Sequence, residues 1–139
     1  MEHFDSLIVS RIYGIISCIG ETFAYIDETE LYNQVDIDQV ISQKRFICRI
    51  ALRGRYNLSI LERYGYQNYQ LSIIHYSYVL VNPLGEFVLR YDNSPHYPYL
   101  ANFPHHKHLY PKDQYPPVSF SGRLSDALAD ARWVVEKLS

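Results

Sequence analysis

Four of the six histidines in this sequence fall within a stretch of 13 residues. A histidine side chain gives and takes protons near neutral pH, and a lysine beside it supplies a fixed positive charge. A carboxylate and a guanidinium stand just before this stretch, at Asp92 and Arg90. The sequence therefore predicts a site for acid–base chemistry that includes His96, His105, His106, Lys107 and His108.

Alternating apolar residues predict the strands that must position these groups. Two such runs, Arg45–Arg53 and Tyr56–Arg63, predict a hairpin that turns at Gly54. Two further runs, Gln70–Val81 and Glu86–Tyr91, predict a third and a fourth strand. Because the connections between the four runs are short, we expect an antiparallel sheet.

Apolar residues three and four apart predict helices from about Phe4 to Gly20 and from about Leu124 to Leu138. After the first helix, the segment 22–32 could form a strand and the segment 36–43 a short helical turn. Six of the seven prolines lie between positions 92 and 117, where they predict a long loop that carries the histidines.

We therefore predict one α+β domain over residues 1–139. Its antiparallel sheet has four or five strands, the N-terminal and C-terminal helices pack against one face, and the histidine loop lies at one edge. The chain has room for a single core. Its composition, 47% hydrophobic and 20% charged, excludes a disordered protein.

The same composition argues against a membrane or disulfide-stabilised protein. The longest apolar run, Leu7–Ile19, contains Arg11 and is shorter than the roughly 20 residues that a membrane-spanning helix needs. We see no signal peptide and expect a cytoplasmic protein. Cys18 and Cys48 are far apart and match no metal-binding or redox spacing, so we expect two buried, unreactive thiols.

Charge is distributed unevenly along the chain. Residues 1–43 hold eight Asp or Glu against one arginine, whereas residues 44–63 hold six Lys or Arg against Glu62. Basic side chains gathered on one hairpin could form a track for RNA phosphates, through Arg49, Arg53 and Arg55. The alternative is a solvated strand face.

The run Arg90-Tyr91-Asp92-Asn93-Ser94-Pro95-His96, followed by Phe103-Pro104-His105-His106-Lys107-His108, resembles the signature of the TumE family, toxins of bacterial type II toxin–antitoxin systems. The runs 56–62 and 76–80 are similar to the family's two preceding strands. Members often have a second histidine where this chain has Tyr97, and Trp in place of Tyr91. The resemblance implies a growth-inhibiting toxin and a small antitoxin, commonly one with a helix-turn-helix DNA-binding domain.

The physical hypothesis for such a toxin is a ribonuclease that needs no metal cofactor. His96 or Glu62 would be the base, His106 or His108 the acid, and Lys107 with Arg90 would hold the phosphate. Asp92 would complete the catalytic group, while His105 and the ring of Tyr97 would contact the RNA substrate. Tyr76, Tyr78 and Tyr91 could also stack on bases, although the first two fit the core better. We expect no membrane partner, and a homodimer stays open.

Two other functions fit the same residues. A divalent metal could be bound by Asp92, His96, His106 and His108, which would make the protein a metal-dependent hydrolase. Adjacent histidines on an extended chain point opposite ways, so His105 and His106 should not share an ion. The third function is a non-catalytic inhibitor that binds a nucleic acid or a protein. Glu62 and Arg90 could also form no more than a cross-strand ion pair.

Overall fold

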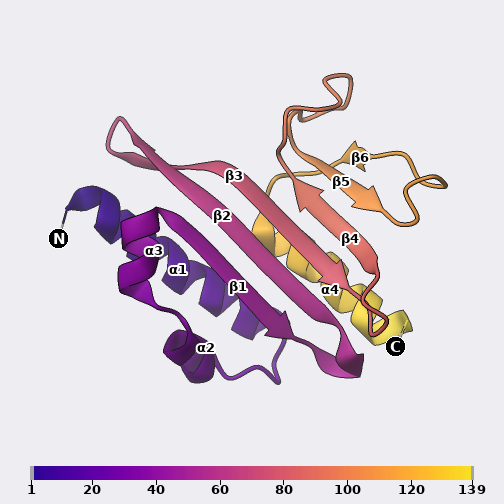
Figure 1. Cartoon of the computed structure of the whole chain (residues 1–139), viewed down its shortest axis with the longest axis horizontal. Coiled ribbons are helices and arrows are strands. Elements are labelled where there is room, and N and C mark those ends of the chain that lie inside the picture. The colour runs from indigo at the N-terminus through magenta and orange to yellow at the C-terminus, as the bar shows by residue number, and fades with distance from the viewer. Residues whose placement is uncertain (1, 139) are drawn as a thin grey trace. The chain divides into compact units, whose positions relative to one another are not determined.

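The computed structural model describes residues 2–138, which form an antiparallel sheet together with four α-helices (Figure 1). The helices are α1 (His3–Thr22), α2 (Glu28–Gln34), α3 (Ile37–Gln43) and α4 (Leu124–Leu138). The strands are β1 (Arg45–Ala51), β2 (Asn57–Gln67), β3 (Gln70–Val81), β4 (Phe87–Asp92), β5 (His106–Leu109) and β6 (Val118–Ser119), with a 3₁₀ turn η1 (Arg53–Arg55) between β1 and β2. The six strands lie in chain order within one sheet, which confirms the predicted α+β class.

Internal contacts divide the chain into two compact units. The first runs up to Phe46 and includes Glu62–Ile74; the second consists of Ile47–Leu61 and the chain from His75 onward. Each unit is described separately below. The single domain expected from the sequence stays a prediction.

In the first unit, α1 buries one face made of Ile8, Ile12, Ile15, Ile16 and Ile19, as the helical spacing predicted. Both α2 and α3 contact α1. The prediction of a strand over 22–32 was wrong. Asp27 caps a helix there instead, because its side chain accepts a hydrogen bond from the Thr29 amide and satisfies an N–H that the first helical turn leaves unpaired. Asp36 caps α3 in the same way, so the predicted helical turn over 36–43 is confirmed.

In the second unit, α4 packs on the sheet through its apolar stripe and through Asp130. The stripe includes the buried Leu124, Leu128 and Val135. Asp130 Oδ2 accepts a hydrogen bond of 2.6 Å from the Tyr91 hydroxyl in β4, and it lies 3.3 Å from Lys107 Nζ in β5. The helix therefore covers the face of β4 and β5 on which Tyr91 and Lys107 lie.

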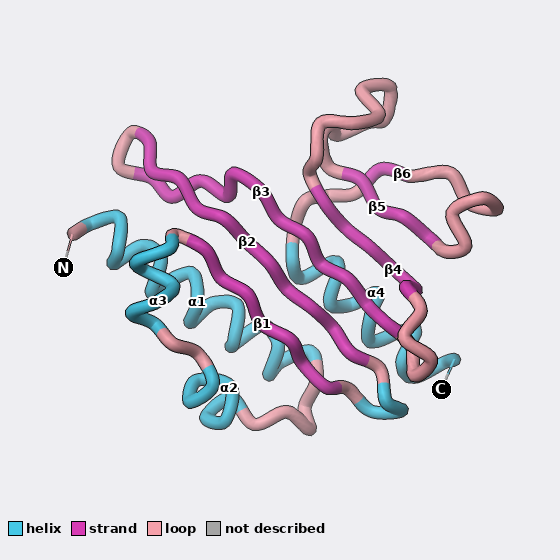
Figure 2. Tube along the Cα trace, viewed as in Figure 1, coloured by secondary structure: helices cyan, strands magenta, loops and turns pink. Residues whose placement is uncertain are grey.

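Within the loop that the prolines predicted, residues 106–109 form the strand β5, so His106 and His108 lie on a strand while His96 and His105 lie in the loop. Figure 2 shows β5 and β6 as short strand segments between the long loops that follow β4. Pro104 and Pro111 flank β5 without interrupting it, so every residue within the strand can donate to its neighbours. β5 pairs antiparallel with β4 on one side and with β6 on the other, which brings the sheet to six strands instead of four or five.

No helix in the described part of the chain is long and apolar enough to cross a membrane. Cys18 and Cys48 are free and half-buried, as expected. Burial raises the pKa of both thiols, which lowers the fraction of reactive thiolate at neutral pH.

Candidate active site

The pairing of β4 with β5 assembles the site from alternate residues. Arg90 lies opposite His108 and Asp92 opposite His106. Residues opposite each other in an antiparallel pair share one face of the sheet, and the residues between them lie on the other face. These four side chains therefore occupy the face away from α4.

Asp92 is the centre of this group. Its side chain is 4% exposed. Its Oδ1 lies 3.0 Å from His106 Nε2 and accepts a 3.0 Å hydrogen bond from the Ser94 amide. Its Oδ2 accepts a 3.1 Å bond from Arg90 Nε. The buried carboxylate therefore has a guanidinium and an amide as hydrogen-bond donors and an imidazole as a third neighbour.

The two histidines differ in their surroundings. Both ring nitrogens of His106 face acceptors, since Nδ1 lies 2.9 Å from the Pro104 carbonyl and Nε2 faces Asp92. A ring nitrogen donates to such an acceptor only when it carries the proton. The His108 ring lies 5.0 Å from the His106 ring. Burial lowers the pKa of His108 below 6.5, and the charges of Lys112 and His106 lower it further.

Tyr97 covers the two histidines. Its ring lies 5.0 Å from the ring of His106 and 5.8 Å from that of His108, edge-on to both. Its backbone has φ 60°, in the left-handed region that bulky residues seldom adopt. The two histidines are at most 5% exposed, and the Tyr97 ring is one of the groups that pack against them.

Three of the predicted residues lie apart from Asp92. The side chain of Lys107 is on the α4 face, paired with Asp130. His105 is also separated from His106, as predicted for adjacent residues: its Nδ1 is hydrogen-bonded to the Tyr76 hydroxyl at 2.8 Å, and its ring stacks on Tyr76. His96 is exposed, and its ring lies edge-on to Tyr97.

Glu62 lies in the first unit, where it is fully buried. It accepts hydrogen bonds of 3.0 and 2.6 Å from Arg11 and of 2.8 Å from the Tyr64 hydroxyl. Arg90, the cross-strand partner considered from the sequence, is paired with Asp92 instead. Glu62 thus has the contacts of a structural ion pair, and its role as a base stays a prediction.

The tyrosines and arginines that the sequence predicted to contact RNA lie in different surroundings. Tyr76, Tyr78 and Tyr91 are buried, which confirms the core role for the first two and places Tyr91 in the core as well. In Figure 1 the turn η1, with Arg53 and Arg55, follows the arrowhead of β1 at the lower right, whereas β4 ends and β5 begins near the top. Contact of these arginines and of Arg49 with RNA stays a prediction.

Sequence reasoning missed Tyr110 and Lys112, which follow β5 directly. The Lys112 ammonium lies 5.8 Å from the centroid of the Tyr110 ring. Burial raises the pKa of Tyr110, while the charge of the neighbouring Arg90 and a hydrogen bond with it oppose that shift. The signal that could have found them is the alternation of His106 and His108, since the next residue in that series is Tyr110.

The donor set also fits a metal ion. Asp92, His106 and His108 each offer one ligand atom, and these atoms lie within 4.8 Å of one another. His96, the fourth ligand predicted, is exposed and lies outside this group among the described residues. The residues that fit an ion are therefore three buried side chains from two adjacent strands.

The structure thus defines an α+β protein that carries a buried carboxylate and two buried histidines on one face of its sheet. The family model described as Toxin TumE matches residues 22–138, and the chain belongs to this toxin family, as the resemblance implied. No curated protein and no solved structure matches the chain. Membership of a toxin family implies a cognate antitoxin.

Proposed function

We propose that this toxin is a ribonuclease that cleaves RNA by metal-independent acid–base catalysis. The observation that carries the proposal is the contact of His106 with His108 beside Asp92. We assign the acid role to His106, whose ring nitrogens both face acceptors, and the base role to His108, because burial lowers its pKa and favours the neutral form. Two adjacent imidazoles in these roles are suited to acid–base catalysis.

In the proposed reaction His108 removes the proton from a ribose 2′-hydroxyl, and the 2′-oxygen attacks the adjacent phosphorus. The new bond from phosphorus to the 2′-oxygen forms while the bond from phosphorus to the 5′-oxygen breaks. His106 gives its proton to the departing 5′-oxygen. The products are a 2′,3′-cyclic phosphate and a 5′-hydroxyl, with no net gain or loss of protons by the enzyme.

Arg90 is placed to stabilise the charge that develops on the phosphate oxygens. Its Nε donates to Asp92, and the guanidinium has further N–H donors on its terminal nitrogens. The Arg90 side chain is 35% exposed, so a phosphate can reach it more easily than it can reach the histidines. The sequence predicted a phosphate-binding role for Lys107 together with Arg90. We now assign this role to Arg90.

The test is cleavage of single-stranded RNA by the purified protein in excess EDTA, with product ends identified by mass spectrometry. We expect 2′,3′-cyclic phosphate ends, and no cleavage where the ribose carries a 2′-deoxy substitution. His106→Ala and His108→Ala should each lower kcat by about 10²- to 10⁴-fold. The matched control is His3→Ala, an exposed histidine of the first unit, which should retain full activity.

The same assay can contradict the proposal in two ways. Cleavage that EDTA abolishes and zinc or manganese restores would replace it with a metal-dependent reaction. Tight RNA binding without cleavage under either condition would leave a non-catalytic inhibitor. Circular dichroism of each variant separates loss of chemistry from loss of fold.

A metal-dependent hydrolase is the second candidate, because Asp92, His106 and His108 resemble a ligand set. A metal-bound histidine usually donates its other ring N–H to a carbonyl or carboxylate, and His106 Nδ1 has such a partner in the Pro104 carbonyl. Three protein ligands with a remaining open position are typical of catalytic zinc. A bound ion would supply an activated water molecule, and Arg90 would still hold the phosphate.

We further propose that the cognate antitoxin carries a helix-turn-helix domain, which the family resemblance supports. A short neighbouring reading frame that encodes such a protein would support this partner. Co-expression of that protein should restore growth in cells that express the toxin and should yield a complex on gel filtration. A neighbouring protein of another class with the same effect would overturn the proposal.

A further inference from the structure

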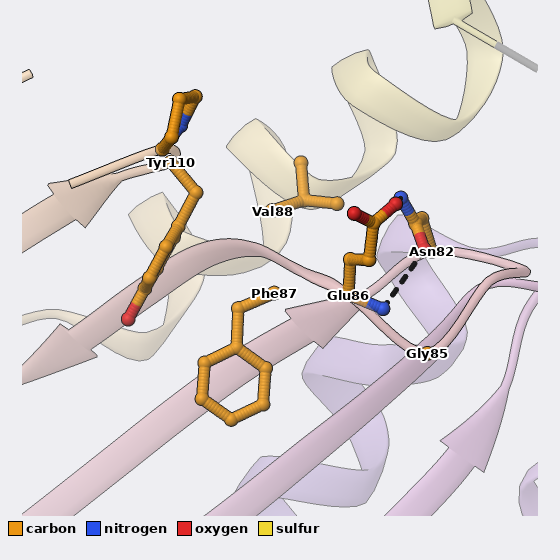
Figure 3. Close-up of a pocket in the computed structure, with 7 residues that line it drawn as sticks. Asn82, Gly85, Glu86, Phe87, Val88 and Tyr110 are labelled. Atoms are coloured by element: carbon orange, nitrogen blue, oxygen red, sulfur yellow. Dashed lines mark hydrogen bonds between the residues drawn. The ribbon is translucent and has the colours of Figure 1, made fainter. Parts of the chain in front are cut away.

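A hollow of about 660 Å³ lies in the second unit, beside the start of β4 and the end of β5 (Figure 3). Its volume is in the range of small-molecule sites. The side chains used below are those of Asn82, Glu86, Phe87, Val88 and Tyr110. None of them was assigned a role from the sequence, and none belongs to the group around Asp92.

The walls of the hollow combine an aromatic ring with a carboxylate. Figure 3 shows the Tyr110 ring on one side, the Glu86 and Asn82 side chains on the other, and Val88 between them. Phe87 lies edge-to-face with Tyr110, with centroids 5.6 Å apart and planes at 81°, which holds the Tyr110 ring in place.

The carboxylate is also held in place. Asn82 Oδ1 accepts hydrogen bonds from the amides of Leu84 and Glu86 at 2.9 and 3.0 Å, and Asn82 Nδ2 donates to Glu86 Oε1 at 3.2 Å. A carboxylate has about four acceptor positions on its two oxygens, so Glu86 keeps acceptors for a ligand. The turn therefore fixes an acceptor group opposite an aromatic face.

Tyr110, which lines the hollow, connects it to the proposed phosphate site. Tyr110 interacts with the Arg90 guanidinium, and Arg90 lies opposite His108 in the β4–β5 pair. The exposed Lys112 adds a second positive charge near the Tyr110 ring. A ligand with a planar base and an attached phosphate would fit both places, with the base in the hollow and the phosphate beside Arg90 and Lys112.

We propose that the hollow binds a guanine base of single-stranded RNA, stacked on Tyr110 and hydrogen-bonded to Glu86. Guanine is the RNA base with two adjacent N–H donors, N1–H and the 2-amino group, on its Watson–Crick edge. A carboxylate accepts both, whereas each of the other three bases places at least one acceptor against it. This inference rests on the proposed function, since the phosphate of that nucleotide would lie at Arg90.

The experiment measures binding of free nucleotides, so it does not depend on cleavage. Dissociation constants for guanosine, inosine and adenosine 3′-monophosphate are determined with the purified protein by titration calorimetry. We expect guanosine monophosphate to bind about ten-fold more tightly than adenosine monophosphate. Inosine monophosphate, which lacks the 2-amino group, should fall between them.

Two substitutions and three control variants assign the contacts. Glu86→Gln should reduce the preference for guanosine to less than about two-fold, while the exposed Glu30→Gln should leave it unchanged. Tyr110→Ala should weaken all three nucleotides by about ten-fold or more, because the stacking face is lost. Tyr110→Phe should retain most of the binding, and Leu84→Ala, at the exposed tip of the same turn, should retain all of it.

The inference is overturned if the wild-type protein binds the three nucleotides equally, or if folded Glu86→Gln keeps the preference for guanosine. Cleavage of RNA together with either result would leave the ribonuclease proposal intact and remove only the base site. The reverse result, preferential guanosine binding that depends on Glu86 without any RNA cleavage, would keep the base site and reject the ribonuclease. Thermal unfolding of each variant confirms that it is folded.

Discussion

Two buried carboxylates of this molecule each pair with an arginine but have different neighbours. Glu62, in the first unit, accepts hydrogen bonds from Arg11 and from the Tyr64 hydroxyl. Asp92, in the second unit, accepts one from Arg90 and faces the ring of His106. Both side chains are at most 4% exposed, so burial and an arginine partner do not distinguish them.

The difference lies in whether the neighbours can change their protonation state near neutral pH. Arginine stays charged, and burial next to Glu62 raises the pKa of Tyr64, so that hydroxyl keeps its proton. Imidazole is the side chain that ordinarily changes its charge near neutral pH, and burial lowers the pKa of His108. The comparison suggests that Glu62 contributes to stability and that Asp92 contributes to chemistry.

The largest expected effect is on activity at Asp92. Asp92→Asn replaces the carboxylate that faces His106 Nε2 and orients its ring, so kcat for RNA cleavage should fall by about 10²- to 10⁴-fold. The cost in unfolding free energy should be smaller than at Glu62, because Arg90 is 35% exposed and can be solvated. Single-turnover kinetics and urea unfolding measure the two effects. Full activity in this variant would remove the distinction between the two carboxylates.

The second effect is on stability at Glu62. Glu62→Gln leaves the partly buried Arg11 without its charged partner, and the unfolding free energy should fall by about 3 kcal/mol. The kcat of the folded variant should stay within about two-fold of the wild type. Urea denaturation followed by circular dichroism measures the loss, with the exposed Glu30→Gln as the control. A large loss of kcat at full stability would instead support Glu62 as the base.

The third effect concerns access to the histidines. Tyr97→Ala removes two edge-on ring contacts and the bulky side chain at a left-handed position, so His106 and His108 should become more exposed. We expect diethyl pyrocarbonate to modify them about ten-fold faster, as followed by peptide mass spectrometry. Tyr99→Ala in the same loop is the control, because that ring is 75% exposed. Equal modification rates would show that Tyr97 does not cover the site.

The smallest effect is on pH dependence. Burial, with the charges of Lys112 and His106, lowers the pKa of His108 below 6.5, so the acidic limb of kcat/KM should lie below that value. Lys112→Met removes one of these charges and should move the limb upward, by a modest amount because Lys112 is exposed and salt screens it. A downward shift, or none at low salt, would contradict this placement of Lys112.

The same lowered pKa links pH to folding. The unfolded chain binds a proton at His108 more readily than the folded chain does, so acid favours unfolding. The stability that neutral His108 contributes is present above pH 6.5 and is lost as the pH falls through the lowered pKa of the folded state. His108→Gln should flatten this part of the pH–stability curve.

Long periodic segments were predictable from the sequence. The strand over 70–81 and the helix over 124–138 match the structure at both ends, since many alternating or helically spaced apolar residues define each of them. The strand β5 was not predictable, because four residues between prolines carry too little pattern and are held by pairing with β4. The acidic segment after α1 was mistaken for a strand, although Asp27 is a suitable helix cap.

The site was predictable in its residue types more than in its geometry. The expectation that His105 and His106 do not share an ion rested on the alternation of side chains along an extended chain, and the two rings do face different partners. The same alternation places Lys107 on the α4 face, away from Asp92. The prediction from the sequence did not apply this rule to Lys107. The exposed position of His96 depends on the conformation of the loop after β4, for which no periodic pattern exists.

The register between β4 and β5 has a consequence for how the sequence can change. Side chains alternate with a period of two, so sliding β5 by one residue along β4 would carry Lys107 to the side of Asp92 and turn both histidines toward α4. Inserting one residue between Pro104 and His106 would therefore exchange the two sides of the strand while every reactive group of the site is kept. The length of this short connection, as much as the identity of the histidines, sets which groups can meet.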